Sequence, residues 1–433
     1  MILTKYKLGE ILDVTRGASL SGEYYATEGE YIRLTCGNFD YQNNCFKENK
    51  SKDNLYYVGD FKSEFLMEEG DIITPLTEQA IGLLGSTAII PESGKYIQSQ
   101  DVAKIICKED LLDKDFAFYL ISSALVKQQL SAAAQQTTIR HTSPDKIKDC
   151  TVWIPELSEQ KRIGKLLRSI DRKIELNRAI NQNLEAMAKQ LYDYWFVQFD
   201  FPNENGRPYK SFGGKMVWNE KQRKYIPEYW EVKSLSNWLE IKSGFPFKSE
   251  TYKPIGRYKI ITIKNVQDGE LVTSGCDYVN DIPSRAKDYI SLQIGDRLIS
   301  LTGNCGRLCV VCEENLLLNQ RVGLLCCDAI YLEYFYNFLN SGTMRTVIDN
   351  LANGAAQANL SPVELCKTDC FIPPIDILLS YNRKVNAIRK AIVQNNQEIS
   401  QLAKQRDELL PLLMNGQVSV NSDLAVSYIT ILR

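Results

Sequence analysis

Apolar residues recur at alternating spacings of four and three residues in the segment that follows Pro155. The positions in this series are Ile163, Leu167, Ile170, Ile174, Asn177, Asn181, Leu184, Ala188, Leu191 and Trp195. This spacing is typical of a coiled-coil seam, and it predicts one long helix over residues 156–198. Ser158 is placed to cap the helix, with Glu159 in the first turn, where a negative charge suits the helix dipole. The stretch from Ile163 to Trp195 would then run about 48 Å, at 1.5 Å per residue.

A second series with the same spacing follows Pro374. Its positions are Tyr381, Val385, Ile388, Ile392, Asn395, Ile399, Leu402, Arg406, Leu409 and Leu413. The series predicts a second helix over residues 375–415, for which Asn415-Gly416 supplies a suitable stop. We expect the two helices to pair with each other along these seams. The alternatives are two independent, solvated helices, or a seam between two copies of the chain.

Both seams carry asparagine near their centres, Asn177 and Asn181 in the first and Asn395 in the second. A buried amide costs stability, but it fixes register and orientation, because an apolar slip would leave the amide without a partner. The pattern therefore predicts a spacer of two long helices that pair in one register.

The rest of the chain is an internal repeat, in which segments of the second half follow the order of the first. The matched segments are KLGEILDVTRGAS (7–19) with SLSNWLEIKSGFP (234–246), YIRLTCGNFD (31–40) with YKIITIKNVQDG (258–269), EEGDIITPLTEQAIG (68–82) with QIGDRLISLTGNCG (293–306), and SPDKIKDCTVWIP (143–155) with SPVELCKTDCFIP (361–373). Gly17 is matched with Gly244, and the last pair continues without a gap into the two helices. The repeat predicts two similar domains related by a pseudo-twofold axis. The alternative is two unrelated α+β domains whose turns and strands share the same chemistry.

The repeat and the helices divide the chain into six segments. We predict a first domain at 1–155, a first spacer helix at 156–198, a connector at 199–224, a second domain at 225–374, a second spacer helix at 375–415 and a tail at 416–433. The connector sequence is rich in Gly, Pro and Asn, which indicates an exposed linker rather than a core element.

The composition is that of a globular protein. With 433 residues, of which 44% are hydrophobic and 24% charged, the chain is long enough for two or three domains. No window approaches the roughly 18 uninterrupted apolar residues of a membrane span, and the first residues lack the features of a signal peptide, so we expect a cytoplasmic protein without membrane contact. The 12 cysteines are scattered, which favours reduced thiols.

The formal charge of −2 argues against a protein that grips nucleic acid by electrostatics alone, since phosphate neutralisation requires clustered Lys and Arg. Local basic surface remains possible. If DNA is the ligand, partner proteins would supply much of the backbone contact, and this chain would contribute base reading through Asn, Gln, Arg, Ser and Thr.

Two patterns resemble catalytic motifs. Cys305, Cys309 and Cys312 have the spacing of radical S-adenosylmethionine enzymes, but Val311 fills a position that is commonly aromatic there, and buried strand cysteines explain the pattern more simply. Pro144-Asp145 followed by Glu159-Gln160-Lys161 resembles a PD-(D/E)xK nuclease. In such a nuclease the second element lies on a strand, whereas here it falls on the first turn of a helix.

Other catalytic signatures are incomplete. His141 is the single histidine, which excludes His-rich zinc sites, and we interpret it as a polar loop residue. Gly94-Lys95 and Gly214-Lys215 lack the upstream Gly and the following Ser or Thr of a phosphate loop. We therefore expect no catalytic residues and no metal ligands in this chain.

Several segments together resemble the specificity subunits of type I restriction-modification systems. They are the two repeated helices, the run SEQKRIGKLLRSIDRKIELN (158–177), YDYWFVQFDFP (192–202) with GGKMVWN (213–219), and LLPLLMNGQV (409–418), and the resemblance covers nearly the whole chain. It implies an α+β fold, with two pseudo-twofold-related α/β target recognition domains separated by two long antiparallel coiled-coil helices.

The resemblance also implies a function and a set of partners. In that family each recognition domain reads one half of an asymmetric, bipartite site in double-stranded DNA, and the helices act as a ruler and as the dock for two modification subunits. Those methyltransferase subunits modify adenine with S-adenosylmethionine, and the restriction subunits use ATP and Mg²⁺ to translocate and cleave DNA. By this resemblance the chain itself has no active site and binds no cofactor.

Polar side chains in the turn-rich loops are the candidates for contact with bases or phosphates. In the first domain they are Arg16, Ser19, Arg33, Thr35, Asn38, Gln79, Gln136, Thr138 and Arg140, and in the second Lys248, Lys264, Asn265, Asn304, Arg307, Arg321, Gln357 and Asn359. A separate group on the helices, which either binds partner subunits or faces solvent, consists of Arg162, Lys165, Arg172, Arg383, Lys384 and Arg389.

Two rival interpretations remain. The same coiled coil could hold two binding modules for proteins or RNA, in which case the chain is a scaffold that does not bind DNA. An enzyme, whether a nuclease or a radical enzyme, would require a bound metal.

Overall fold

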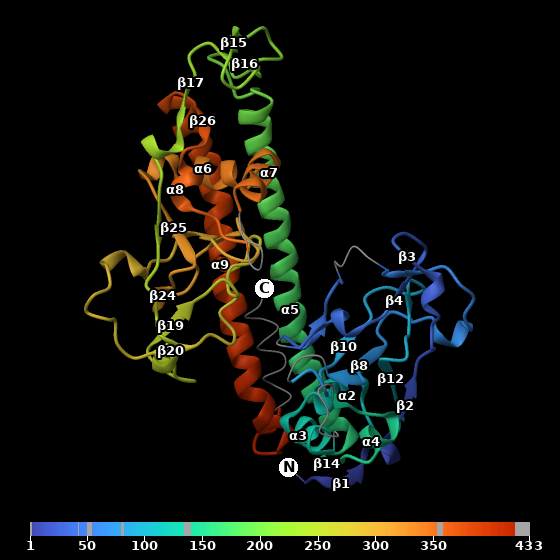
Figure 1. Cartoon of the computed structure of the whole chain (residues 1–433). Coiled ribbons are helices and arrows are strands. Elements are labelled where there is room, and N and C mark those ends of the chain that lie inside the picture. Colours follow the sequence, from blue (N-terminus) through green and yellow to red (C-terminus); the bar gives the residue numbers. More distant parts are fainter. Residues whose placement is uncertain are drawn as a thin grey trace. The chain divides into compact units, whose positions relative to one another are not determined.

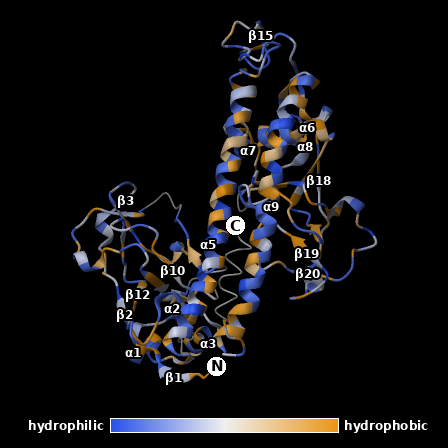
Figure 2. Ribbon diagram, turned by 180° about the vertical axis from the view of Figure 1, so that it is seen from behind, coloured by the Kyte–Doolittle hydropathy of each residue, from blue (hydrophilic) through white to orange (hydrophobic). Residues whose placement is uncertain are grey.

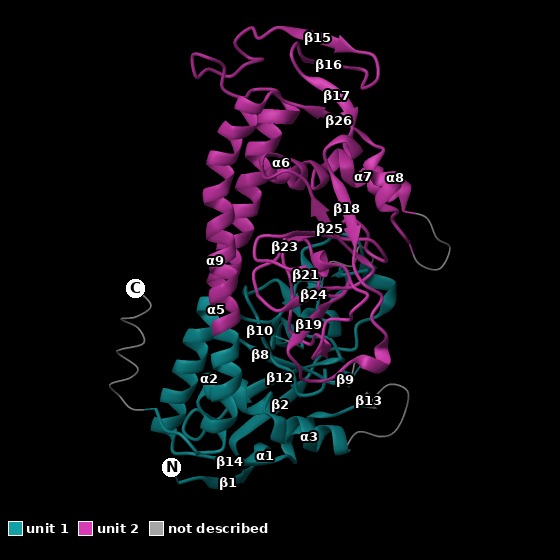
Figure 3. Cartoon of the chain, turned by 90° about the vertical axis from the view of Figure 1, so that its left-hand side faces the viewer, with its two compact units in different colours: residues 1–173, 402–433 teal, residues 174–401 magenta. Residues whose placement is uncertain are grey.

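A computed structural model describes residues 2–41, 43–49, 54–78, 82–133, 140–352 and 358–420 of the chain. They form two compact units (Figure 3). Unit 1 comprises Met1–Lys173 and Leu402–Arg433, and unit 2 comprises Ile174–Gln401. Each unit thus contains one of the expected domains together with part of each long helix. None of the helices in the described ranges combines the length and hydrophobicity that a membrane crossing requires.

Unit 1 is built on two four-stranded sheets with short helices beside them (Figure 1). One sheet has the order β10 (Ala88–Ile89), β8 (Ile72–Pro75), β12 (Val102–Cys107), β2 (Leu12–Arg16), and the other the order β11 (Tyr96–Ile97), β4 (Tyr31–Arg33), β7 (Tyr56–Tyr57), β3 (Tyr25–Ala26). The two-stranded pairs are β1 (Thr4–Lys7) with β14 (Thr151–Ile154), β9 (Thr77–Glu78) with β13 (Arg140–His141), and β5 (Phe39–Asp40) with β6 (Cys45–Phe46). The helices are α1 (Leu8–Ile11), α2 (Lys114–Ile121), α3 (Ala124–Ala133) and α4 (Pro144–Lys148), with 3-10 turns at Gly22–Tyr24, Cys36–Asn38 and Ser63–Phe65.

Unit 2 has the same plan. Its four-stranded sheets have the orders β18 (Glu240–Ser243), β25 (Val322–Cys326), β22 (Arg297–Ser300), β23 (Leu308–Val310), and β20 (Tyr278–Val279), β19 (Tyr258–Ile261), β24 (Leu316–Leu318), β21 (Ser291–Leu292). The pairs are β17 (Glu231–Ser234) with β26 (Asp369–Ile372) and β15 (Met216–Asn219) with β16 (Lys224–Pro227). The helices are α6 (Ala329–Leu339), α7 (Gly342–Leu351) and α8 (Pro362–Cys366), with 3-10 turns at Leu235–Asn237, Ser249–Thr251 and Asp288–Ile290.

The strand orders confirm that the sequence repeat is a structural repeat. In both units the strand that ends just before the matched glycine, β2 or β18, is an edge of the first sheet and pairs antiparallel with β12 or β25. In the second sheet of each unit, β4 or β19 pairs in parallel with β11 or β24. These partners are the strands that come just before β12 and β25 in the chain. In each unit the first sheet packs against helices through one apolar core and shares a second apolar core with the other sheet. Figure 2 shows several of these strands in orange among bluer loops.

The matched glycines lie where two backbones approach each other closely. A Cβ atom on Gly17 would lie 2.3 Å from the carbonyl oxygen of Gln98, and one on Gly244 would lie 2.2 Å from that of Leu318. Neither position has room for a side chain, and the obstacle is backbone that cannot rotate away. The repeat therefore keeps glycine at both places for a steric reason.

Two long helices connect the parts of the chain. Helix α5 spans Leu157–Tyr192 and continues as a π-helical turn at Asp193–Val197, and α9 spans Ile375–Met414. The predicted stop is confirmed, because α9 ends immediately before Asn415 and Gly416 has the positive φ of +69° that suits a helix terminator. The predicted cap is two residues late, because α5 begins at Leu157 and Glu156 occupies the N-cap position. Ser158 lies inside the first turn, and its hydroxyl donates to the Glu156 carboxylate instead of capping the helix.

Most seam positions are buried or half-buried. Ile163, Leu167, Ile170, Ile174, Asn177, Tyr381, Val385, Ile392, Ile399 and Leu402 are buried, and Asn181, Leu184, Ile388 and Asn395 are half-buried. Hydrophobic and hydrophilic residues alternate along both helices in Figure 2. This arrangement is that of a paired amphipathic helix rather than a solvated one.

Polar contacts within unit 2 show that the helices run antiparallel. The Asn177 amide donates to Glu398 (2.8 Å), and the Asn181 amide donates to Asn396 (2.8 Å). Asn395 donates in turn to the carbonyl oxygen of Asn181 (2.9 Å). Residue numbers rise along α5 as they fall along α9, so the predicted antiparallel pairing is confirmed, and the seam asparagines bond across it.

Arg389 lies at the centre of a buried ion network in unit 2. Its guanidinium contacts Glu185 on α5 and Glu333 on α6, and Glu333 also pairs with Arg297 on β22. Burial alone would raise the pKa of Glu333, but the two guanidinium groups outweigh burial and hold that pKa below its usual value. The expectation that Arg389 contacts solvent or a partner is therefore wrong, because its side chain is only 5% exposed.

Unit 1 contains its own buried ion pair between the helices. Arg406 of α9 donates to Asp171 of α5 (2.8 Å), and each side chain is 12% exposed. The hydroxyl of Tyr119 on α2 donates to the same carboxylate. Arg406 occupies a predicted seam position, and its charge is neutralised there by the Asp171 carboxylate.

The connector departs from the sequence-based expectation. Phe199 and Phe201 are buried against Trp230, and their ring centroids lie 5.2 and 5.4 Å from that of Trp230. Strands β15 and β16 form a hairpin. The buried Asp200 carboxylate accepts from the N–H and hydroxyl of Ser211 (2.8 and 2.6 Å). The Gly- and Pro-rich composition indicated an exposed linker. That prediction is wrong for Phe199, Asp200 and Phe201, which are buried in unit 2, whereas residues 204–207 and 210–213 are exposed as expected.

We expect Gly17→Ala and Gly244→Ala to lower the free energy of unfolding by about 3 kcal/mol each, because the added methyl group overlaps a backbone carbonyl. Gly22 and Gly342 are matched controls, since a Cβ there meets no atom closer than 3.9 Å. Urea unfolding followed by circular dichroism would measure the difference. Equal effects in the tight and open positions would contradict the steric explanation.

We expect Arg406→Met to destabilise unit 1 by about 3 kcal/mol, because it leaves the buried Asp171 carboxylate without its cation. Lys404→Met on the same helix is the control, since Lys404 and Glu408 form only an exposed pair 4.0 Å apart. Hydrogen exchange of unit 1 peptides reports the local stability. If the two variants exchange alike, the buried pair does not stabilise the helices.

Candidate nucleic-acid interface

In unit 1 three loops meet at the end of β8. The Leu76 N–H donates to the Asp101 carbonyl (2.8 Å), and the Thr142 N–H donates to the Leu76 carbonyl (2.9 Å). Thr77 pairs with His141 across β9 and β13, and the Thr77 hydroxyl lies 3.3 Å from both the Asp101 carboxylate and the His141 Nδ1. The threonine is buried, Asp101 is half-buried and His141 is exposed. We call Thr77, Asp101 and His141 the Thr77 cluster.

Unit 2 has the same backbone arrangement at the end of β22. The Leu301 N–H donates to the Arg321 carbonyl (3.0 Å), and the Leu360 N–H donates to the Leu301 carbonyl (2.8 Å). Thr302 forms an antiparallel bridge with Asn359, and its hydroxyl donates to the Asn359 Oδ1 (2.9 Å) and accepts from the Arg321 Nη1 (3.5 Å). Thr302 is buried, whereas Arg321 and Asn359 are exposed. We call these three residues the Thr302 cluster.

Two predicted residues of the first domain lie beside the Thr77 cluster. Arg16, at the end of β2, is exposed, and its Nε donates to the carbonyl of Gln100 (2.8 Å), the neighbour of Asp101. Ser19 is exposed in the loop that follows. Arg16 is thus oriented by a backbone contact at the same end of the sheet.

Arg33 is engaged in the fold of unit 1. Its Nε donates to the Asn54 carbonyl (3.0 Å), and its guanidinium lies 4.1 Å from the ring centroid of Tyr25. A half-buried guanidinium stacked on an aromatic ring is held by cation–π attraction. These contacts assign Arg33 to the packing of the second sheet.

Asn38 and Asn265 are structural residues. In each unit the Asn Oδ1 accepts from the N–H of a threonine three residues earlier, Thr35 (2.9 Å) or Thr262 (2.8 Å). The amide then donates to a carbonyl across the turn, and the side chains are buried. The expectation that Asn38 and Asn265 contact bases is therefore wrong, and Thr35 belongs to the same capping motif.

Predicted residues of the second domain gather around the Thr302 cluster. Asn304 is exposed in the turn after it, and Arg307 lies next to a cavity of about 250 Å³ that Asn304 and Arg345 also line. Arg307 and Arg345 share one carboxylate, that of Asp268, at 3.8 and 3.9 Å. Asp349 also lines this cavity, so the two guanidinium groups lie near two carboxylates and their charges are balanced locally.

The remaining candidates are dispersed or lie outside the description. Lys248 and Lys264 are exposed on loops of unit 2. Gln79, Gln136, Thr138 and Gln357 fall outside the described residues, and for Arg140 the structure describes the β13 backbone only.

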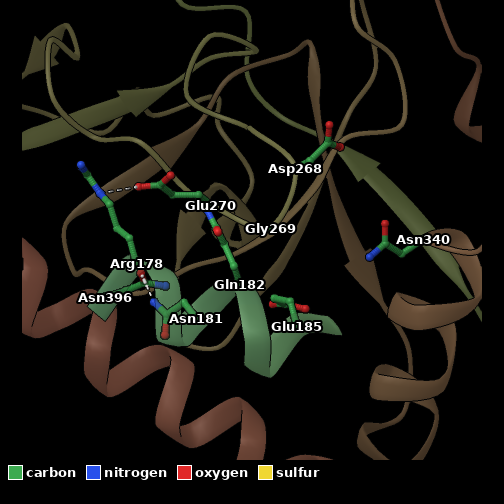
Figure 4. Close-up of a pocket in the computed structure, with 9 residues that line it drawn as sticks. All are labelled: Arg178, Asn181, Gln182, Glu185, Asp268, Gly269, Glu270, Asn340 and Asn396. Carbon is green, nitrogen blue, oxygen red and sulfur yellow. Dashed lines mark hydrogen bonds and ion pairs between the residues drawn. The ribbon is translucent and has the colours of Figure 1, made fainter. Parts of the chain in front are cut away.

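A polar pocket of about 290 Å³ lies beside the helix pair of unit 2 (Figure 4). It is lined by Arg178, Asn181, Gln182, Glu185, Asp268, Gly269, Glu270, Asn340 and Asn396. The lining groups bond to one another, as Asn181 does to Asn396 (2.8 Å) and Arg178 to Glu270 (3.8 Å). We interpret the pocket as a solvated space next to the seam asparagines rather than as a catalytic site.

Sequence reasoning missed Asp101 and treated His141 as a loop residue, although His141 lies on the short strand β13. A signal for both was present. The segment QSQDV (98–102) matches LNQRV (318–322), which aligns Asp101 with Arg321, and the shift that takes Ser143 to Ser361 aligns His141 with Asn359. Extending the repeat over these segments would have matched Asp101 with Arg321 and His141 with Asn359, although it would not have shown that the residues of each pair meet.

The cysteine pattern does not form a metal site within the described residues. No group of three or more His, Cys, Asp or Glu is placed to hold a metal there. Burial raises the pKa of Cys312 to about 11 and that of Cys309 well above its usual value, which disfavours the thiolates that a cluster requires. Cys309 lies on β23 and Cys312 shortly after it, and both are packed among apolar core residues.

The chain is similar to one family of known proteins. Residues 3–186 match the profile of the type I restriction modification DNA specificity domain. The MjaIX specificity subunit of a type I restriction enzyme from Methanocaldococcus jannaschii is 25% identical over 74% of this chain and 73% of its own length. The HindI specificity subunit from Haemophilus influenzae is 24% identical over 75% of this chain and 81% of its own length.

A solved structure shares the fold. The specificity subunit of a type I restriction-modification system from M. genitalium aligns with a TM-score of 0.56 and 16% identity, covering 96% of both chains. The structural similarity therefore includes both units and both long helices.

We expect Asn38→Ala and Asn265→Ala to lower the free energy of unfolding by about 2 kcal/mol, because each leaves a threonine N–H and a turn carbonyl unpaired. Asn304→Ala, at an exposed position of unit 2, should leave it unchanged. Thermal unfolding of the purified variants would test this. An Asn265→Ala variant as stable as Asn304→Ala would contradict the structural assignment.

Proposed function

We propose that this chain, a member of the type I restriction-modification specificity-subunit family, reads an asymmetric two-part site in double-stranded DNA with one half-site per unit. The observation that carries the proposal is the pair of units with one backbone plan and different side chains at matched positions. A repeated scaffold positions two readers alike, and unlike side chains on it select unlike sequences.

The distribution of charge supports reading by hydrogen bonds. The chain has a net charge of −2, so phosphate attraction cannot dominate the binding of this chain alone. The exposed polar groups at the sheet ends include Arg16 in unit 1 and Asn304, Arg321 and Arg345 in unit 2. Such groups suit contact with base edges and a small number of phosphates.

The helices provide a surface for partner proteins. Leu176, Ile180 and Met187 of α5 are 59%, 39% and 55% exposed, and their spacing places them along one face of the helix. Exposed apolar residues in such a row are typical of protein contact sites. We assign this face to a modification subunit, and we expect the pseudo-symmetric helix pair to bind two of them.

We assign the chemistry to the partners. Adenine methylation with S-adenosylmethionine, and ATP- and Mg²⁺-dependent translocation and cleavage, would belong to the modification and restriction subunits. This chain would be a non-catalytic subunit of a cytoplasmic complex.

Co-expression in a host without DNA methylation tests the proposal. The chain is produced with the methyltransferase subunits encoded beside it, and N6-methyladenine is mapped across the genome by single-molecule sequencing. We expect an asymmetric bipartite motif only when both components are present. Methylation that does not depend on this chain would overturn the proposal in favour of a scaffold that does not bind DNA.

A Leu176→Glu/Ile180→Glu variant tests the partner surface. Both side chains are exposed, so the charges should leave unit 2 folded but abolish co-purification of the methyltransferase and the motif with it. Glu175→Lys, on an exposed neighbouring position, controls for charge alone. Normal assembly of the double variant would move the docking site elsewhere.

A further inference from the structure

The Thr77 and Thr302 clusters combine one constant residue with two that differ. Both have a buried threonine bonded to residues from two other segments. The flanking residues are Asp101 and His141 in unit 1, but Arg321 and Asn359 in unit 2.

The shared backbone does not require this difference. Where the backbone itself constrains the residue, both units keep the same one, as at Gly17 and Gly244 or at Asn38 and Asn265. The flanking residues of the clusters differ in charge although the backbone bonds around them are the same. His141, Arg321 and Asn359 are exposed, so their side chains can contact a ligand at the surface.

The hydrogen bonds of the Thr77 cluster determine whether unit 1 presents donors or acceptors. A carboxylate only accepts, so the single proton of the Thr77 hydroxyl is directed to Asp101. The His141 Nδ1 must then be the donor in its contact with that hydroxyl. In the neutral ring this leaves Nε2 as an acceptor. Unit 1 therefore offers acceptors, the carboxylate of Asp101 and Nε2 of His141.

The hydrogen bonds of the Thr302 cluster lead to the opposite conclusion for unit 2. The Thr302 hydroxyl donates to the Asn359 Oδ1. The other polar atom of that amide is Nδ2, whose N–H groups only donate. Arg321 has donors only, and one of them contacts Thr302. Unit 2 therefore offers donors where unit 1 offers acceptors.

We propose that these two pairs determine base specificity, Asp101 and His141 in unit 1 and Arg321 and Asn359 in unit 2, with the buried threonine as a positioning residue. This inference rests on the proposed function. Acceptors bind the amino groups of adenine or cytosine, and donors bind guanine O6 and N7 or thymine O4. The half-site of unit 1 thus includes an amino-bearing base edge, and that of unit 2 an acceptor-bearing edge, at equivalent positions.

Reciprocal exchange of the pairs tests the proposal in the assembled methyltransferase. One variant carries Asp101→Arg and His141→Asn, and the other carries Arg321→Asp and Asn359→His. The methylated motif of each is mapped by single-molecule sequencing. We expect the first variant to change one half of the motif and the second to change the other half, each at one or two bases. The half that is left unaltered serves as an internal control for folding and assembly.

Single variants resolve the case in which an exchange abolishes methylation. Asp101→Asn and Arg321→Gln should each reduce discrimination at one base of one half-site by about tenfold, the loss expected for one specific base contact. Asp13→Asn and Arg285→Gln make the same chemical changes at exposed positions away from the clusters and should leave the motif unchanged.

The outcomes separate the two hypotheses. A wild-type chain that directs no methylation overturns the proposed function. A wild-type motif that persists in both exchanged variants, or in both Asp101→Asn and Arg321→Gln, overturns only the assignment of these pairs. A change confined to the same half-site in both exchanged variants also overturns it.

Discussion

Buried charges between antiparallel helices constrain this protein more than any other contact. In unit 2 the Arg389 guanidinium joins α5 through Glu185 and α6 through Glu333, and in unit 1 Arg406 of α9 joins Asp171 of α5. An ion removed from water is tolerated only with its partner present, so a shift of one helix along the other by a turn would leave these charges unpaired. A purely apolar seam would impose no such penalty, because one leucine layer can replace another.

The seam asparagines add to this selection of register. Asn181 bonds to both Asn395 and Asn396, so the two helices meet at one defined layer in the middle of the unit 2 segment. Ion pairs and amides together give a helix pair with a single alignment. The proposed reading of a two-part DNA site requires such a single alignment.

The two units separate the residues that maintain the fold from those that distinguish one unit from the other. Gly17 and Gly244 allow the same close approach of backbones, and Asn38 and Asn265 close the same turn. These residues are identical because the backbone leaves no alternative. The residues that flank Thr77 and Thr302, of which Asp101 is half-buried and the others are exposed, have no such constraint, and they differ in charge and in hydrogen-bonding direction. A duplicated scaffold can therefore acquire a second specificity without a change of fold.

The sequence by itself determined the repeat, the two helices, their seam and the end of α9, because helix periodicity, turn glycines and internal similarity are local signals. It placed Arg16, Asn304 and Arg321 correctly on the surface at the sheet ends. Only the tertiary structure decided that Arg389 is buried, that Asn38 and Asn265 are internal, and that Phe199 anchors the connector. Whether a polar side chain bonds inward or faces solvent depends on residues far away in the chain. His141 and Asp101 come together only when β13 and β12 reach the same sheet end, and no local pattern encodes that meeting.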